Sequence, residues 1–230
     1  MQRTTFRDNS EESMFNMNAK KYEFRFKVEC HNVIEVVSCV FHTILFLRSK
    51  GKFLRTKNGY QESAQHFKEV NMEFVDLTYV CIPSVELDNS INESITKFSK
   101  ELHDCNEPKT GKISLEFYRI DKHAVPFLSR HVVWEVWTVH IEVVDLMSVR
   151  TIMLNNMNLN EQLTDAIFNI NENVNLGNNY VPQFSSQEVD HVFNTNFCNF
   201  QTYLFNISHQ TKLFSTSLGK TARRLFDELH

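Results

Sequence analysis

The sequence VWEVWTVHIEVV at residues 133–144 alternates apolar and polar side chains over most of its length. Alternation with a period of two predicts a β-strand with one buried face. ISLEFYRI at residues 113–120 has a similar pattern, and a short connection joins the two stretches. Strands joined in this way favour antiparallel pairing, so these residues predict two neighbouring strands of an antiparallel sheet. The predicted buried face of the longer strand consists of Val133, Trp137, Val139, Ile141 and Val143.

A further strand and a long apolar helix are predicted upstream of this pair. Residues 22–28 place Tyr, Phe, Phe and Val at alternate positions between charged residues, which predicts a half-buried strand. Residues 33–47 have helical spacing of apolar side chains, and Asn32 with Glu35 would form a capping box at the start. Because this stretch is short and contains Glu35 and His42, it predicts a buried helix, and no transmembrane segment is expected.

A β-hairpin is predicted at Asn58-Gly59, the strongest short signal for such a turn. Several basic residues surround it, namely Arg48, Lys50, Lys52, Arg55 and Lys57. This cluster would suit an anionic partner or a membrane surface. The favoured interpretation is a solvated hairpin, because runs of charge usually lie on solvated surfaces.

The remaining elements complete a chain in which helices and strands do not alternate strictly. Residues 72–81 and 200–208 predict strands, and residues 148–174 and 221–229 predict helices. Ser84 is a suitable N-cap for another helix. The apolar positions of that helix are Leu87, Ile91, Ile95, Phe98 and Leu102. This element order predicts an α+β fold in which helices cover one face of an antiparallel sheet.

The length allows one large domain or two small ones, and we expect one large domain preceded by a short extension. The chain has 230 residues, of which 42% are hydrophobic and 23% are charged. Residues 1–20 are polar and predict a flexible N-terminal extension, and residues 21–230 predict a single domain. The net charge of −4 argues against nucleic-acid binding, which depends on neutralising phosphates.

The sequence predicts no catalytic, cofactor-binding or metal-binding residues. The five cysteines are widely spaced and form no C-x-x-C pair, so we expect free and largely buried thiols. The ten histidines include no H-E-x-x-H motif. Gly219-Lys220-Thr221 matches the end of a phosphate-binding loop, but Phe214 stands where that loop needs glycine.

The loop at residues 121–132 carries Val125, Pro126 and Phe127 between polar neighbours. Pro126 fixes its own φ angle and stiffens the loop. A stiff loop that presents Phe127 to solvent would lose little entropy on docking into a partner. The other interpretation is that Phe127 folds back over the edge of the sheet, and the residues favour neither.

Several collinear strings resemble the autophagy-related protein 101 family from about residue 26 onward. The most specific string is SLEFY at residues 114–118, followed by Pro126-Phe127 and then by WEVWTV at residues 134–139. The other strings are VFHTIL at 40–45, RSKGKF at 48–53, FVDLTYV at 74–80, ELD at 86–88, QEVD at 187–190, Val192-Phe193, Tyr203-Leu204 and RRL at 223–225.

This resemblance implies a HORMA fold, with a central antiparallel sheet, three main helices on one face and an additional hairpin. It also implies a non-catalytic, cytoplasmic adaptor subunit of the autophagy-initiating kinase complex, recruited to the phagophore assembly site. Such a subunit would pair with the HORMA domain of autophagy-related protein 13 and stabilise it. The isolated chain would then be able to form a homodimer through the same surface.

The resemblance further implies an exposed finger that recruits downstream autophagy factors. The family finger reads Trp-Pro-Phe, and the matching residues here are Val125, Pro126 and Phe127. Replacing indole by isopropyl removes roughly 100 Å² of contact area, or about 2 kcal/mol. The Asn-rich segment at residues 149–174 is a second departure from the family.

An alternative within the same fold is a HORMA regulator that clamps a peptide. In that case the C-terminal segment at residues 209–230 would wrap the ligand like a safety belt. Ligand would then protect this segment from limited proteolysis.

Overall fold

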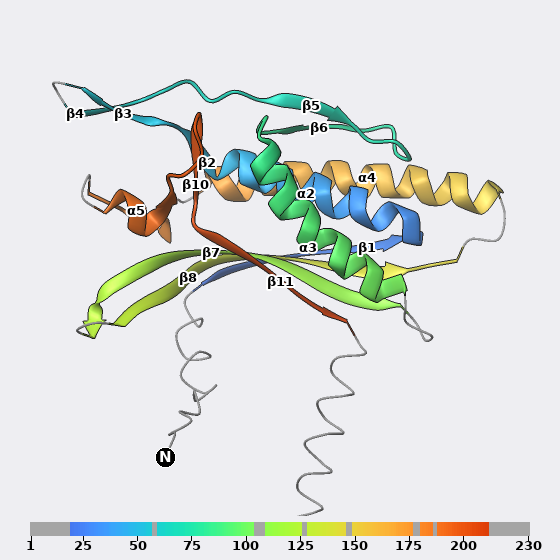
Figure 1. Ribbon diagram of the computed structural model, residues 1–230. Helices are drawn as coiled ribbons and strands as arrows, with labels where there is room; N and C mark the ends of the chain where they lie inside the picture. The colour runs from blue at the N-terminus through green and yellow to red at the C-terminus, as the bar shows by residue number, and fades with distance from the viewer. Residues whose placement is uncertain are drawn as a thin grey trace, which may run out of the picture.

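The main sheet of the protein contains four long or medium strands in the order β1-β8-β7-β11 (Figure 1). The computed structural model describes residues 19–56, 59–103, 109–125, 128–145, 149–176, 180–185 and 188–211. The bounds of the four strands are Lys20–Val28 for β1, Leu128–Val143 for β8, Thr110–Val125 for β7 and Phe205–Thr211 for β11. Helices lie over one face of this sheet, which agrees with the predicted α+β class.

The sheet is mixed, so the prediction of an antiparallel sheet is wrong for one strand pair. β7 pairs antiparallel with β8 and with β11, but β1 pairs parallel with β8, with Lys20 opposite Glu135 and Val28 opposite Val143. Parallel strands need a long crossover connection. The chain between β1 and β8 supplies one, because it includes two of the long helices. The HORMA topology itself stays a prediction.

A β-bulge interrupts the pairing of β7 with β8 at Trp134. Phe117 lies opposite Glu135, whereas the next residue, Tyr118, lies opposite Val133. The extra residue on β8 shifts the alternation of its side chains. Trp134 is consequently buried and Val133 only half-buried, so the prediction that Val133 lies on the buried face is corrected.

Helix α2 (Val33–Leu47) has the predicted bounds and lies at the centre of the fold. It contacts two other helices and the strand β6 (Thr78–Cys81), and most of its side chains are buried. The predicted capping box is wrong, because Asn32 has helical φ and ψ angles and makes no capping hydrogen bond. The carboxylate of Glu35 instead accepts hydrogen bonds from the backbone N–H groups of Glu73 and Phe74.

Helix α3 (Val85–His103) confirms the predicted cap and the predicted buried face. The Ser84 hydroxyl oxygen accepts a hydrogen bond of 3.2 Å from the N–H of Leu87. The five predicted apolar positions are all fully buried. A Ser N-cap satisfies one of the unpaired N–H groups at the start of a helix and so fixes where it begins.

Helix α4 (Val149–Asn175) is the longest helix among the described residues. The side chains on its buried face are Leu159, Leu163, Ala166, Ile170 and Val174. Asparagine is a mediocre helix former, so this apolar face must stabilise the helix. Some asparagines also bond along the helix, since Asn173 bonds to Asn169 and Asn175 to Asn171.

Three smaller sheets complete the fold. β2 (Ser49–Gly51), β10 (Phe200–Tyr203) and β9 (Phe193–Asn194) form one, next to the short helix α5 (Val189–Val192). The predicted hairpin is confirmed as β3 (Phe53–Thr56) and β4 (Gly59–Glu62). β5 (Lys68–Asn71) pairs with β6, and both hairpins lie on the far side of the helices from the main sheet (Figure 1).

Two predicted strands are shorter or divided in the structure. Of residues 72–81, only the last four form a strand, because residues 72–77 connect β5 to β6. Residues 200–208 divide at Leu204, where the chain passes from β10 to β11 and changes sheet. The predicted helix at residues 221–229 lies outside the described residues, as do residues 1–18, so the predicted extension at 1–20 stays a prediction.

Of the cysteines, the structure describes four, and all four are free. Cys39 and Cys81 are buried, Cys30 is half-buried and Cys198 is exposed. Burial raises the pKa of the Cys39 thiol to about 12, with the Glu35 charge as a smaller cause, so this thiol stays protonated. The expectation of largely buried thiols is wrong for Cys198.

We predict that Gly51→Ala destabilises the protein. A Cβ at Gly51 would overlap the carbonyl oxygen of Ser63, and that carbonyl cannot move away freely. The backbone N–H of Ser63 donates to the backbone carbonyl of Lys52 at 2.9 Å. The Ser63 hydroxyl oxygen accepts from the backbone N–H of Lys52 at 2.8 Å. We expect the free energy of unfolding, measured in urea, to fall by about 2–3 kcal/mol.

The matched control is Lys50→Ala on the same strand. The Lys50 side chain is 40% exposed and lies 4.0 Å from Glu62. Loss of such an exposed ion pair should cost less than about 1 kcal/mol. Equal stability of Gly51→Ala and the wild type would show that the close approach of the two chain segments is not required.

Candidate interaction surfaces

The β7–β8 hairpin carries the residues predicted as a finger. The pairing of its two strands continues to Asp121, which lies opposite Arg130. After an irregularity in the register, Val125 lies opposite Leu128. Figure 1 shows the hairpin extending past α2, α3 and α4 at one end of the main sheet, where the short helix α5 lies over it. Val125 is the last residue of β7, and Pro126 and Phe127 lie outside the described residues. The structure thus places a long hairpin where the sequence predicts a finger.

A buried ion pair joins the body of this hairpin to the end of α2. The Arg48 guanidinium donates from Nε to Glu135 Oε1 at 2.9 Å and from Nη2 to Glu135 Oε2 at 2.5 Å. The side chains are 4% and 0% exposed. Two parallel hydrogen bonds to one carboxylate fix both the distance and the orientation of the two groups. Arg48 follows α2 directly and Glu135 follows the bulge in β8, so the pair connects two layers of the fold.

Two aromatic side chains complete the hydrogen bonding of Glu135. Trp137 donates from Nε1 to Glu135 Oε1 at 2.6 Å, and the Tyr180 hydroxyl donates to Oε2 at 2.8 Å. The Tyr180 hydroxyl oxygen in turn accepts from Arg48 Nη2 at 2.9 Å. Four donated hydrogen bonds therefore surround one buried carboxylate. A buried charge is tolerated only when it is paired and hydrogen-bonded in this way.

Burial and the charge pair set the protonation states of this cluster. Burial by itself lowers the pKa of Arg48, but the hydrogen bonds and the charge of Glu135 outweigh it, and the net shift is upward. Burial, together with hydrogen bonds to Tyr22 and Glu135, raises the pKa of Tyr180. Burial raises the pKa of Tyr203 to about 12. Arg48 therefore stays charged at physiological pH, and Tyr180 and the neighbouring Tyr203 stay neutral. The cluster acts as a structural clamp.

The predicted solvated basic cluster is wrong for two of its members. Arg48 is buried, as described above. Lys52 donates from Nζ to the backbone carbonyls of Thr195 at 2.5 Å and Phe197 at 2.6 Å, which ties β2 to the β9–β10 connection. Of the others, Lys50 is partly exposed, the Arg55 side chain is not described and Lys57 lies outside the described residues.

Sequence reasoning also missed Glu135 as a buried residue, although a signal was present. Glu135 is in phase with Trp137 and Val139 on β8, so the alternation itself places a carboxylate on the apolar face. A charge in such a position requires a buried cation as its partner. Arg48, which directly follows the long apolar helix, is the candidate cation in the sequence.

The outward side of α4 has an exposed apolar line. Met153, Met157 and Phe168 are 63%, 64% and 69% exposed. At 100° per residue they fall within roughly 60° of one another, opposite the buried face of the helix. Leu154 and Leu176 are also exposed, at 58% and 62%. Exposed apolar residues aligned along one helix, with no described residue covering them, are typical of a docking surface.

The described residues hold no group of three or more His, Cys, Asp or Glu side chains arranged to bind a metal ion. One window, Cys30–Leu47, has the length and composition of a membrane span, but 67% of it is buried inside the fold. That burial is expected of the core helix predicted from the sequence. Of the segment proposed as a safety belt, residues 209–211 pair with β7, and residues 212–230 lie outside the described residues.

Comparisons with known proteins agree on one family. The family model described as autophagy-related protein 101 matches residues 25–188. The chain is 35% identical over 215 residues to autophagy-related protein 101 of Xenopus tropicalis and 36% identical to that of Homo sapiens, covering 92% of this chain and 98% of each relative. It is 26% identical over 119 residues to the protein of Arabidopsis thaliana, covering 51% of this chain and 49% of that relative.

We predict that Arg48→Ala lowers the free energy of unfolding by about 3–5 kcal/mol, because it leaves the Glu135 carboxylate buried without its cation. The double variant Arg48→Met/Glu135→Leu should be more stable than Arg48→Ala, since it removes both charges. Urea unfolding of the two variants and the wild type measures the difference.

The exposed pair Lys27–Glu142 is the control for this comparison. Its atoms are 3.2 Å apart, but the side chains are 68% and 48% exposed. Lys27→Ala should therefore cost less than about 1 kcal/mol. A similar small effect of Arg48→Ala would contradict the assignment of Arg48–Glu135 as a clamp.

Proposed function

Because the chain belongs to the autophagy-related protein 101 family, we propose that it is an adaptor subunit of the autophagy-initiating kinase complex. In this proposal the protein adopts the HORMA fold, pairs with the HORMA domain of autophagy-related protein 13 and stabilises it. It acts in the cytoplasm and at the phagophore assembly site. Members of this family are non-catalytic, so its activity consists of binding.

The exposed apolar line on α4 is the observation that most supports pairing through this helix. α4 has 27 residues and so spans about 40 Å. A stable protein interface buries about 1,200–2,000 Å² in total, which a helix of this length with its flanking residues can supply. Flexible methionines beside one large aromatic side chain suit a surface that must fit a partner closely.

The charges on α4 indicate the character of the partner surface. Glu161, Asp165 and Glu172 are exposed on this helix, and Arg150 is its single basic residue. The partner face should therefore be apolar at its centre and carry basic residues at its rim. The many neutral asparagines on α4 add no charge, so apolar contact should dominate the affinity.

We predict that Met157→Glu/Phe168→Glu abolishes pairing without unfolding the protein. Both side chains are more than 60% exposed, so a carboxylate there is solvated in the free protein but buried in the complex. The measurement is co-purification with the HORMA domain of autophagy-related protein 13 at micromolar concentration. Circular dichroism of the isolated variant should match that of the wild type.

Val85→Glu is the matched control for this experiment. Val85 is 74% exposed, but it lies at the start of α3 rather than on α4. It should leave pairing intact. Absence of a complex with the folded wild-type chain would contradict the proposed pairing, and pairing by the α4 variant would assign the interface to another surface.

The finger is the second part of the proposal. Its matching residues are Val125, which ends β7, and Pro126 and Phe127, which come between Val125 and the first residue of β8 in the sequence. The hairpin extends past the three long helices α2, α3 and α4, which supports a role in recruiting downstream autophagy factors. Aromatic anchors usually dominate such contacts, so Phe127 should carry most of the binding.

We predict that Phe127→Ala weakens recruitment of downstream autophagy factors by about 2 kcal/mol in binding free energy. Folding and HORMA pairing should be almost unchanged. Val125→Trp is the complementary variant, and it should strengthen recruitment because it restores an indole. Pull-down of downstream factors and a thermal melt measure the two properties. A large fall in melting temperature for Phe127→Ala would show that Phe127 belongs to the core.

A further inference from the structure

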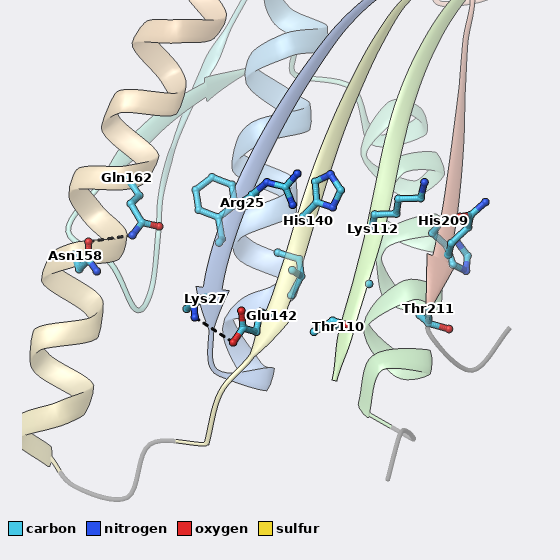
Figure 2. Close-up of a pocket in the computed structure, with 14 residues that line it drawn as sticks. Arg25, Lys27, Thr110, Lys112, His140, Glu142, Asn158, Gln162, His209 and Thr211 are labelled. Carbon is cyan, nitrogen blue, oxygen red and sulfur yellow. Dashed lines mark hydrogen bonds and ion pairs between the residues drawn. The ribbon is translucent and has the colours of Figure 1, made fainter. Parts of the chain in front are cut away.

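The face of the main sheet opposite the helices contains a groove of about 1030 Å³. Figure 2 shows that its side chains come from all four strands and from α4, which lies beyond the edge strand β1. An antiparallel sheet commonly exposes one polar face to water. This face differs from a plain solvated face, because it is recessed and because its charges are unevenly distributed.

Three basic side chains occupy neighbouring positions in one row across the groove. Arg25 on β1 lies opposite His140 on β8, and His140 lies opposite Lys112 on β7. Adjacent strands are about 4.8 Å apart, so the permanently charged Arg25 and Lys112 lie on either side of His140, which can donate a hydrogen bond. A row of donors of this kind indicates that an anionic group would bind there favourably.

Carboxylates of the sheet compensate this row only in part. A single carboxylate, that of Glu23, lies 2.9 Å from Arg25 Nη2 and 3.3 Å from His140 Nε2. In the next row, Lys27 pairs with Glu142 at 3.2 Å. Lys112 is exposed and has no carboxylate partner among the residues that the structure describes. Lys112 therefore contributes a positive charge that no described carboxylate neutralises.

Neutral hydrogen-bonding groups border the basic row on both sides. Asn158 and Gln162 of α4 line the groove and bond to each other at 3.0 Å, and Gln210 of β11 lies opposite Lys112. Amide side chains at the edges suit the backbone N–H and C=O groups of a peptide. A lipid surface offers no backbone N–H groups to these amides, which therefore favour a peptide over a membrane as the occupant.

We propose that this groove binds an extended acidic segment of a partner protein. Arg25 and Lys112 lie two strand spacings apart, or about 10 Å, which an extended chain covers in three residues. The segment would therefore place one carboxylate on Lys112 and, three residues away, a second on Arg25, where it competes with Glu23. The basic row lies on the strands, whereas the exposed apolar line lies on α4, so variants of Arg25 and Lys112 test this groove without changing the apolar line.

The test uses the full chain and a fluorescein-labelled peptide of Glu-Ser-Ser repeats, with binding measured by fluorescence anisotropy. We expect binding at low salt that weakens as salt rises, and no binding of the matching Gln-Ser-Ser peptide. Arg25→Glu/Lys112→Glu should raise the Kd by at least about tenfold. The milder variant Lys112→Gln should also raise it, and thermal melts should confirm that both variants fold.

Lys97→Glu/Lys100→Glu is the matched control, because it makes the same change in net charge on the exposed side of α3. Its Kd should change by less than about twofold. The proposal is overturned if this control weakens binding as much as the groove variant does, or if the Gln-Ser-Ser peptide binds equally well. It is also overturned if vesicles rich in phosphatidylserine bind through Arg25 and Lys112 while the acidic peptide does not.

Discussion

Glu135 carries a charge in the apolar interior, and the surrounding structure is arranged to neutralise it. Removing the cation from a buried ion pair typically costs several kcal/mol. The carboxylate therefore requires Arg48 from the end of α2, Trp137 from its own strand and Tyr180 from the segment after α4 to arrive together. These contacts fix the end of α2 and the segment around Tyr180 relative to the body of the β7–β8 hairpin.

The two faces of the main sheet have different tasks. The face toward the helices contributes the core, with Trp137, Val139 and Phe117 fully buried. The other face carries charged and amide side chains and forms the groove. The exposed apolar line lies on α4, which the sheet face meets only at the edge of the groove. An adaptor with separate surfaces can hold several partners at once, and the linked contacts can add to its overall avidity.

Local periodicity predicted the long helices α2, α3 and α4 well, but it could not predict contacts between distant segments. The bounds of α2 and the buried positions of α3 follow from apolar spacing, and Ser84 caps α3 as expected. The bulge at Trp134 and the parallel pairing of β1 arise from tertiary packing, which no local pattern encodes. Arg48 was misjudged for the same reason, since its partner lies 87 positions away. For the finger, the residues could be named from the sequence, whereas the length of the β7–β8 hairpin could be seen only in the structure.

The parallel pairing of β1 with β8 has a consequence for biosynthesis. β1 leaves the ribosome early, but its partner strand ends only at Val143. At about 5–20 residues per second, translation of the intervening chain takes on the order of ten seconds. During that interval the nascent β1 has an unpaired edge, and such edges favour misassembly with other chains. Its alternate charged residues, Glu23, Arg25 and Lys27, would protect the waiting strand from aggregation.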